Sequence, residues 1–265
     1  MDKYTLLFKL DKMFIDFLCL GMTITRFPFF VKNRGARKRN VKLMEYKCSK
    51  KCYILGLGPS LKNVDLSLLD GDVIATNRFI NFEGGKGVTP KYYVLADKAF
   101  YEKDIELTQK AMEKFPETAF VFDGKYSGNK NFINKNNVFY AYMWQGYCNS
   151  KRKMDFTKRL PQLGNVVCLA ISLAIYCGYE EIYLLGCDFN SFASQKAIHC
   201  YEEKDSGRLW TMSYELFCYS FVSDIHNELN KIANKKGLKI INITEGSLID
   251  AYVKNHDMMK KLRKG

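Results

Sequence analysis

Two adjacent apolar runs, at residues 164–178 and 180–188, most constrain the fold of this chain. The first, GNVVCLAISLAIYCG, is apolar on almost all sides, which predicts a buried helix that ends at Gly178. The second, EEIYLLGCD, is a short continuous apolar run, typical of a central strand that is buried on both faces of a parallel sheet. Such a pair requires helices packed against a sheet.

The same alternation of strands and helices runs through residues 50–255. Further strands are expected at residues 52–58, 72–77, 91–97, 118–123, 138–142 and 238–244, and further helices at 61–70, 98–115 and 211–236. This order predicts an α/β, Rossmann-like fold: a mostly parallel sheet, helices on both faces and a lid loop after a late strand. Ligands of such sheets bind beyond the carboxyl ends of the strands, so the residues that follow each strand are the site candidates.

Positive charge is concentrated at the two ends of the chain. There are 41 Lys and Arg residues against 28 Asp and Glu, a formal net charge of +13, which indicates an anionic partner. Residues 1–42 hold ten of the basic residues and three of the acidic ones. No RNA-binding, helix-turn-helix or zinc-finger pattern accompanies this charge, so a nucleic-acid partner is the least favoured.

Residues 1–49 are expected to form an amphipathic, basic membrane-association segment. Residues 4–31 are apolar but carry five charged side chains, so they lack the roughly 20 uninterrupted apolar residues of a membrane span. A basic run from Lys32 to Lys42 follows, an order typical of an interfacial helix on anionic lipid. The alternative is a helix packed on the body of the protein. We therefore expect a membrane segment at 1–49, a catalytic domain at 50–255 and a basic tail at 256–265.

Cysteine usage favours the cytoplasm. The nine cysteines are odd in number and most of them lie inside apolar runs, as expected of free buried thiols in a reducing compartment. With the membrane segment, this predicts a cytoplasmic protein that is peripheral on the inner face of the cell membrane.

A glycine-rich turn, Gly56-Leu57-Gly58-Pro59-Ser60, follows the first expected strand. Glycines let the backbone approach a ligand, and free amides at the start of a helix attract phosphate. Leu61 stands where a dinucleotide fingerprint has its third glycine, and no Gly-Lys-Ser/Thr follows, so neither that fingerprint nor a P-loop is present. The turn indicates a mononucleotide-type site, and an ordinary turn in which Ser60 caps the helix is the alternative.

Two blocks of the sequence resemble known proteins. GLGPSLKNVDLSLLDGDVIATNRF and GYEEIYLLGCDFN are similar to the two blocks of the family 42 bacterial sialyltransferases. Both blocks also resemble a wider group of proteins related to an archaeal pterin pyrophosphokinase, in which an element like His199-Cys200-Tyr201 follows. The resemblance covers about residues 50–255. It implies a CMP-sugar donor, which is a substrate and not a cofactor, held by Gly56, Gly58, Ser60 and Asn77, with Gly186 and Asp188 lining the site. Two further donor-binding candidates come from their positions: Asp97 directly follows an expected strand, and Tyr201 lies in the loop after the second block, where it can donate to the leaving phosphate.

The resemblance also implies a general base. In the sialyltransferases a His from the loop after the second block has this role, and His199 lies in that loop here, whereas His226 and His256 are expected at the surface. A neutral imidazole can take the proton of a sugar hydroxyl as the hydroxyl attacks the anomeric carbon. A loop-structuring role for His199 is the alternative. Gly164 and Asn165 precede the buried helix, whose positive end attracts a phosphate or carboxylate, unless they simply cap it.

Together these features predict a metal-independent, inverting glycosyltransferase. It would transfer an acidic nonulosonic sugar from a CMP-sugar to a cell-surface glycan acceptor, as in capsule or lipooligosaccharide biosynthesis. Asp70-Gly71-Asp72 matches the D-x-D of metal-dependent glycosyltransferases, but it precedes a strand and is interpreted as a turn. The alternative is a pterin pyrophosphokinase-like enzyme or another nucleotide-binding protein. Whether the chain forms a homo-oligomer is left open.

Overall fold

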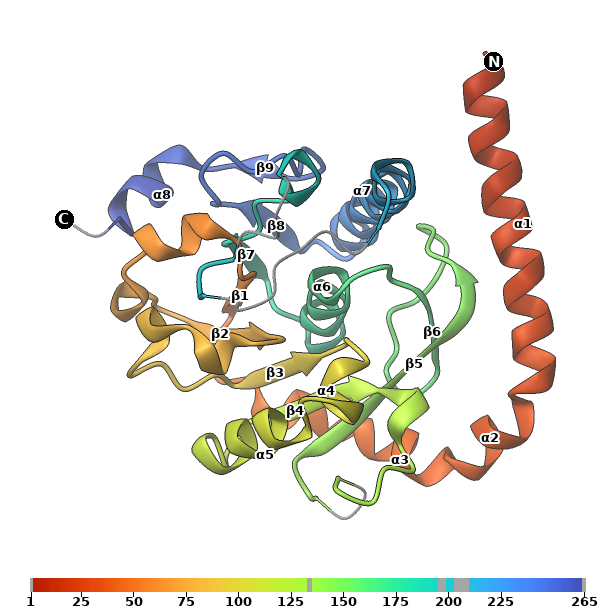
Figure 1. Ribbon diagram of the computed structural model, residues 1–265, viewed down its shortest axis with the longest axis horizontal. Helices are drawn as coiled ribbons and strands as arrows, with labels where there is room; N and C mark the ends of the chain where they lie inside the picture. Colours follow the sequence, from red (N-terminus) through yellow and green to blue (C-terminus); the bar gives the residue numbers. More distant parts are fainter. Residues whose placement is uncertain (1, 133–134, 195–198, 203–209, 264–265) are drawn as a thin grey trace.

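A computed structural model describes residues 2–132, 135–194, 199–202 and 210–263. Its described strands form one parallel sheet of nine, in the order β6-β5-β4-β3-β2-β1-β7-β8-β9 (Figure 1). Every neighbouring pair is parallel, so the expected α/β fold is confirmed. The strands are β1 (Lys51–Leu55), β2 (Asp72–Thr76), β3 (Tyr92–Leu95), β4 (Ala119–Asp123), β5 (Val138–Tyr147), β6 (Arg159–Gln162), β7 (Glu181–Leu185), β8 (Lys239–Asn242) and β9 (Val253–Lys254).

Helices cover both faces of this sheet and enclose two hydrophobic clusters. Side chains of β1 alternate between them: Cys52 and Ile54 enter one cluster, and Tyr53 and Leu55 enter the other. The first cluster contains residues of α6 (Val166–Cys177) and α7 (Met212–Lys235). Residues of α4 (Ala99–Glu102), α5 (Ile105–Lys114) and α8 (His256–Lys261) pack on the second.

Helix α6 forms as expected because local and tertiary preferences agree. The Asn165 side chain accepts a hydrogen bond from the Cys168 N–H at its start, and Gly178 ends it with φ of +72°. Nine of its residues are buried, and it packs against β1, β2, β3 and α7. The strand that follows, β7, is central in the sheet, with β1 and β8 as neighbours.

Three expected elements differ in the structure. The expected helix at residues 61–70 is wrong: only 3₁₀ turns form, at Pro59–Asn63 and Leu66–Leu68, the second capped by the Asp65 side chain. The expected helix at 98–115 breaks at residues 103–104 into α4 and α5. The strand expected at 138–142 extends to Tyr147 through an irregularity in its pairing with β6, and β6 and β9 were not expected.

The N-terminal residues form α1 (Lys3–Thr25), α2 (Phe27–Lys32), α3 (Arg34–Arg39) and a 3₁₀ helix (Asn40–Tyr46). Figure 1 shows α1 as the outermost element, on the side of the molecule where β5 and β6 lie. Arg37, Asn40 and Leu43 are buried, and the Asn40 amide donates to the Tyr140 and Phe156 carbonyls. Residues 37–43 thus pack on the sheet domain, and the boundary after residue 49 stays a prediction.

In the expected basic tail, α8 packs on the domain and Leu262 is buried. Among the described helices, none combines the length and apolarity needed to cross a bilayer.

All nine cysteines are free thiols, and seven of them are buried.

Candidate active site

A pocket of about 750 Å³ opens at the carboxyl ends of β1, β2, β3 and β7. It lies where the strand order changes direction, because β1 has β2 on one side and β7 on the other. Nine of the eleven residues expected at the site line it: Gly56, Gly58, Asn77, Asp97, Asn165, Gly186, Asp188, His199 and Tyr201. The other two, Ser60 and Gly164, do not.

The glycine turn after β1 lies in direct contact with the turn after β7. The Gly56 and Gly58 amides donate to the Leu185 and Gly186 carbonyls, each at 2.8 Å. A Cβ on Gly56 would lie 2.5 Å from the Gly186 oxygen, so only glycine permits this approach. The Gly56 and Gly58 amides are therefore bonded to the end of β7 and to the residue that follows it, and neither is free for a phosphate.

Asp188 is held in the pocket by Ser60. The Ser60 hydroxyl and amide donate to the two carboxylate oxygens of Asp188, at 2.7 and 3.2 Å. Burial raises the pKa of Asp188 above its usual range, and the hydrogen bonds from Ser60 partly oppose this shift. Ser60 is therefore a positioning residue behind the pocket wall.

The backbone is strained at two residues of the pocket. Asn77 has φ of +41° and Phe189 has φ of +59°, and these are the described non-glycine residues with positive φ. The Asn77 amide donates to the Val94 carbonyl, and its own carbonyl accepts from the Tyr93 hydroxyl. Its buried side-chain Oδ1 has no hydrogen-bond partner among the described residues, which leaves an acceptor for a ligand N–H or O–H.

The segment that carries His199 is attached to the glycine turn. The Cys200 amide donates to the Leu57 carbonyl at 2.8 Å, and the Cys200 side chain is buried in the core. This attachment sets His199 and Tyr201 at the pocket, with their rings parallel and 5.1 Å apart between centroids. Residues 195–198 and 203–209 of the expected lid lie outside the described part of the chain.

Gly164 and Asn165, the two candidates that precede the buried helix, have structural roles at the start of α6. Gly164 has φ of +70° and packs against Val222 of α7, while Asn165 caps α6 and also lines the pocket.

His226 is not at the surface as expected: it is fully buried, and its Nδ1 lies 2.9 Å from the Tyr252 hydroxyl. Burial lowers the pKa of His226 to about 3. His256 is exposed at the start of α8.

Sequence reasoning missed an ion pair in the pocket wall. Arg78 and Asp104 are 2.6 Å apart, and Lys103 lies beside them. Arg78 comes next to Asn77 after β2, so its position directly after a strand is a sequence signal for a site residue. Lys103 and Asp104 lie at the break between α4 and α5, which the expectation of one continuous helix concealed. Tyr219 of α7 also lines the pocket, and no sequence signal marks it.

The D-x-D sequence lies at the opposite edge of the sheet. Asp70 accepts hydrogen bonds from Lys51 and Tyr53, and Asp72 accepts from the Cys48 and Ser49 amides and the Tyr179 hydroxyl. These contacts join the amino ends of β1 and β2. Within the described ranges, no three His, Cys, Asp or Glu side chains are grouped closely enough to hold a metal ion.

Solved structures of glycosyltransferases have a similar fold. The sialyltransferase CstII from Campylobacter jejuni with cytidine-5'-monophosphate shares 18% identity over 77% of this chain and 84% of its own, with a TM-score of 0.49. A variant of the sialyltransferase CST-II in complex with CMP shares 19% over 82% of this chain and 91% of its own, with a TM-score of 0.50. The Maf glycosyltransferase from Magnetospirillum magneticum AMB-1 shares 13% over 80% of this chain and 34% of its own, also with a TM-score of 0.50.

The family is shown by a different comparison. No curated protein matches the chain. A family model described as 6-hydroxymethylpterin diphosphokinase MptE-like matches residues 27–192, which is more than half of the chain and includes the glycine turn, Asn77 and Asp188. The chain therefore belongs to the MptE-like family.

Proposed function

We propose that this protein is a glycosyltransferase that moves an acidic sugar of the nonulosonic kind from a CMP-sugar donor to a glycan acceptor. The observation that carries the proposal is the placement of one imidazole, that of His199, over a pocket walled by residues from four strand ends. The fold shared with a CMP-bound sialyltransferase and with the Maf glycosyltransferase supports it.

The reaction is a single inverting displacement. His199 takes the proton of an acceptor hydroxyl while the hydroxyl oxygen bonds to the anomeric carbon of the sugar. The bond from that carbon to the phosphate oxygen of CMP breaks, and its electron pair leaves with the phosphate. Arg78 and Tyr201 line the same pocket and carry N–H and O–H donors for this developing negative charge.

The acceptor in this proposal is a cell-surface glycan built on a lipid, such as a capsule or lipooligosaccharide precursor. Such acceptors are assembled at the inner face of the cell membrane, and a peripheral position of the protein there gives the pocket access to them. The exposed apolar side chains of α1 support this position.

The family match favours a second candidate, a pyrophosphokinase that transfers diphosphate from ATP to a pterin hydroxyl. This activity uses Mg²⁺, which prefers carboxylate oxygens. In the pocket, Asp188 already accepts from Ser60, Asp104 pairs with Arg78, and Asp97 accepts from the Ala99 amide. These carboxylates keep unused lone pairs, but within the described ranges no three His, Cys, Asp or Glu side chains are grouped closely enough to hold a metal ion, so the pocket fits this reaction less well.

Thermal unfolding in the presence of CMP, or of ATP with Mg²⁺, separates the two candidates. A ligand at 100 times its Kd stabilises the folded state by about 2.7 kcal/mol, which for a domain of this size raises Tm by roughly 5–10 °C. We expect this shift with CMP and not with ATP and Mg²⁺. The reverse result supports the pyrophosphokinase, and no shift with either nucleotide contradicts both.

His199→Ala tests the proposed base. We expect turnover to fall by about 10²–10⁴-fold, because general-base assistance is lost, while the CMP-induced shift in Tm is retained. His256→Ala is the matched control, since His256 is exposed on α8 and is not among the pocket residues. Undiminished turnover in His199→Ala removes His199 from the mechanism.

A further inference from the structure

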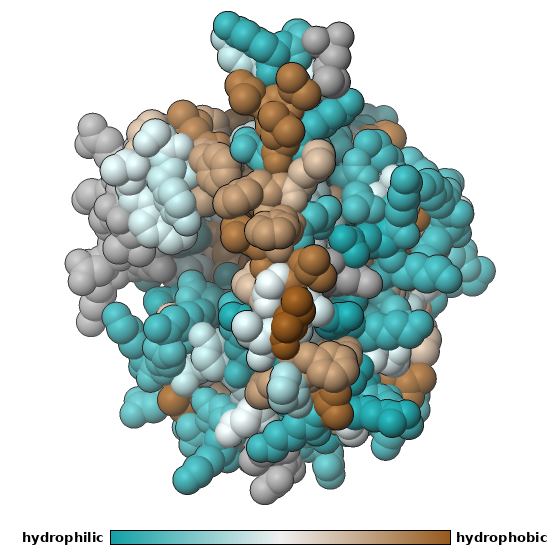
Figure 2. All heavy atoms as spheres, turned by 90° about the vertical axis from the view of Figure 1, so that its right-hand side faces the viewer, coloured by the Kyte–Doolittle hydropathy of each residue, from teal (hydrophilic) through white to brown (hydrophobic). Residues whose placement is uncertain are grey.

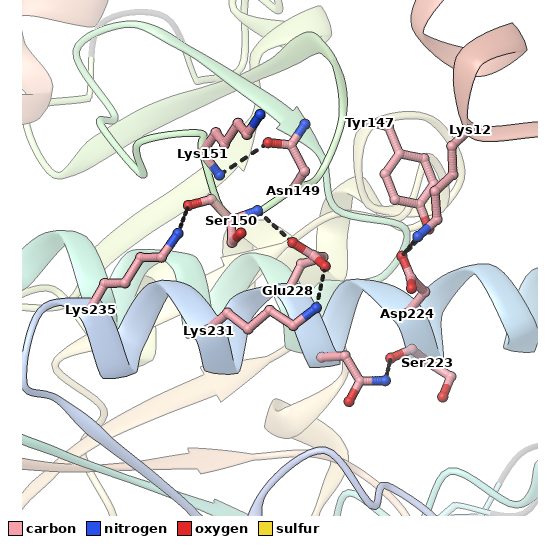
Figure 3. Close-up of polar contacts among 11 residues, drawn as sticks. Lys12, Tyr147, Asn149, Ser150, Lys151, Ser223, Asp224, Glu228, Lys231 and Lys235 are labelled. Carbon is pink, nitrogen blue, oxygen red and sulfur yellow. Dashed lines mark hydrogen bonds and ion pairs between the residues drawn. The ribbon is translucent and has the colours of Figure 1, made fainter. Parts of the chain in front are cut away.

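One face of α1 is attached to the body of the protein by charged groups. Lys12 pairs with Asp224 of α7 at 2.6 Å, and the Tyr147 hydroxyl donates to the same carboxylate (Figure 3). One turn on, Asp16 accepts from the Tyr147 amide at 2.7 Å and pairs with Arg152 at 3.2 Å. These contacts determine which side of α1 faces the sheet domain and which side faces away.

The side of α1 that faces away is apolar and uncovered. Nine large apolar side chains lie on it, and each is between 45% and 69% exposed. At roughly 100° per residue they span an arc of about 160° around the helix. Figure 2 shows them as a hydrophobic band along the face of the molecule that α1 forms. This outward face consists of Leu6, Leu7, Leu10, Met13, Phe14, Phe17, Leu18, Leu20 and Ile24.

Basic residues follow α1 along the chain, and four of them, Lys32, Arg34, Lys38 and Lys42, are exposed. From residue 17 to residue 44 the chain has no acidic residue and seven basic ones: Arg26, Lys32, Arg34, Arg37, Lys38, Arg39 and Lys42. Phe27 and Val31 of α2, which continue the apolar series beyond α1, are 56% and 50% exposed.

A second basic group lies in residues 149–159, which we call the basic loop. A depression of about 470 Å³ is lined by its side chains, Asn149, Lys151, Arg152, Lys153, Asp155, Lys158 and Arg159. The basic loop touches α1 and α2, because Arg152 pairs with Asp16 of α1 and Arg159 lies over the Phe30 ring of α2. Figure 3 shows its attachment to α7, where the Ser150 amide donates to Glu228 and its carbonyl accepts from Lys235.

We propose that the outward face of α1 lies in the interfacial layer of a bilayer that contains anionic phospholipid. The apolar side chains enter the acyl boundary, and exposed basic residues of α2, α3 and the basic loop bind lipid phosphates: Lys32, Arg34, Lys38, Lys151 and Lys153. Because Lys12 and Asp16 are paired with the protein body at the middle of the helix, α1 lies in the plane of the membrane with the sheet domain on its other side.

The width of the outward face identifies the bilayer rather than a second copy of the chain as its partner. A two-helix seam uses a narrow stripe of residues at alternating spacings of three and four. Leu6, Leu10, Met13, Phe17, Leu20 and Ile24 have that spacing, but Leu7, Phe14 and Leu18 lie beside the stripe and are equally exposed. A bilayer covers the whole arc, and the surrounding positive charge complements an anionic lipid surface. This inference concerns a surface separate from the pocket and does not depend on the reaction there.

Vesicle flotation of the full-length protein tests the inference. We expect binding to phosphatidylcholine vesicles that contain phosphatidylglycerol, weaker binding as the salt concentration rises, and little binding to phosphatidylcholine alone. The triple variant Leu10→Ser, Phe14→Ser, Phe17→Ser should bind at least about tenfold more weakly, because it removes apolar surface that enters the lipid. Its Tm and its CMP-induced shift should match those of the parent protein, since all three side chains are exposed.

Matched control variants replace exposed apolar or basic side chains at other places on the protein. Leu68→Ser with Leu248→Ser removes two leucines that are 52% and 51% exposed outside α1 and should not alter binding. Lys151→Glu with Lys153→Glu in the basic loop should weaken binding to anionic vesicles, whereas Lys110→Glu with Lys239→Glu, on exposed lysines of α5 and β8, should not.

Three results would overturn the inference. The first is vesicle binding that the triple variant retains in full. The second is equal, salt-independent binding to both kinds of vesicle. The third is a stable dimer in light scattering that the triple variant converts to a monomer, without vesicle binding by either protein, which would assign the outward face to a second copy.

Discussion

Replacing Gly58 by alanine tests the contact between the two turns that form the pocket floor. Gly58 has φ of −70° and ψ of 162°, a conformation that any residue adopts, so the backbone itself does not require glycine. The added Cβ, however, would lie 2.0 Å from Asp188 Oδ2 and 2.9 Å from the Gly186 carbonyl oxygen. Because the Gly58 amide is bonded to that same carbonyl, the Asp188 side chain is the group that must move.

The expected cost follows from the hydrogen bonds that Asp188 would lose. Its carboxylate accepts from the Ser60 hydroxyl and amide, and hydrogen bonds to a charged group contribute about 1.5–3 kcal/mol each. Since Asp188 borders an open pocket, water replaces part of the lost hydrogen bonding. We therefore expect the free energy of unfolding to fall by about 2–4 kcal/mol. This corresponds to a decrease in Tm of roughly 5–15 °C, measured by differential scanning calorimetry. Because Asp188 lines the pocket, the displaced carboxylate also changes the shape of the pocket, so CMP affinity measured by calorimetry should fall.

Two comparison variants complete this experiment. Ser60→Ala removes only the hydroxyl donor, so its stability should lie between those of the parent and Gly58→Ala, and the pKa of Asp188 should rise further. Gly128→Ala is the control, because a Cβ there meets no atom within 4 Å. If Gly58→Ala unfolds at the same temperature as Gly128→Ala and binds CMP equally well, the inferred contact between the turns is wrong.

Three further substitutions have expected outcomes. Asn77→Gly should raise the free energy of unfolding by up to about 1 kcal/mol, because glycine relieves the strain of the positive φ. The same substitution should weaken CMP binding, because it removes the unpartnered Oδ1. Stronger CMP binding in calorimetry would contradict this. Asp72→Ala should lower stability by about 3 kcal/mol, because the buried Tyr179 hydroxyl and the part-buried Cys48 and Ser49 amides lose their acceptor, and urea unfolding measures this while the CMP-induced shift stays unchanged. Burial lowers the pKa of His226 to about 3 from its ordinary 6.5, so its contribution to stability is complete above pH 6.5 and is lost as the pH falls toward 3. The free energy of unfolding should therefore fall by up to about 1.4 kcal/mol per pH unit in that range, and His226→Gln should flatten this dependence in urea titrations at several pH values.

Local sequence patterns were sufficient to predict the central part of the fold. The apolar run of α6, capped by Asn165 and Gly178, and the continuous apolar strand β7 admit few environments other than the middle of an α/β domain with helices on both faces of its sheet. The glycine turn, Asn77 and Asp188 were recognisable because each directly follows a strand, and parallel strands bring their carboxyl ends to one edge.

Other features depended on contacts between distant residues. The break between α4 and α5, which brings Asp104 to Arg78, has no glycine or proline to mark it. His226 lies on an amphipathic helix, and only the packing of α7 on the sheet placed its ring beside Tyr252 instead of at the surface. The 3₁₀ turns at 59–68 replaced an expected helix, as Leu61 and Leu66 both pack into the core beneath them.

By itself, the sequence determined the α/β architecture, the strand ends that form the pocket and the uneven distribution of charge, because these depend on periodicity and composition. The tertiary structure alone decided that the Gly56 and Gly58 amides donate to Leu185 and Gly186 at the end of β7, that Cys200 ties His199 to the glycine turn, and that α1 turns one apolar face outward. These features arise from hydrogen bonds and ion pairs between segments far apart in the chain, which leave no periodic signal in the sequence of either segment.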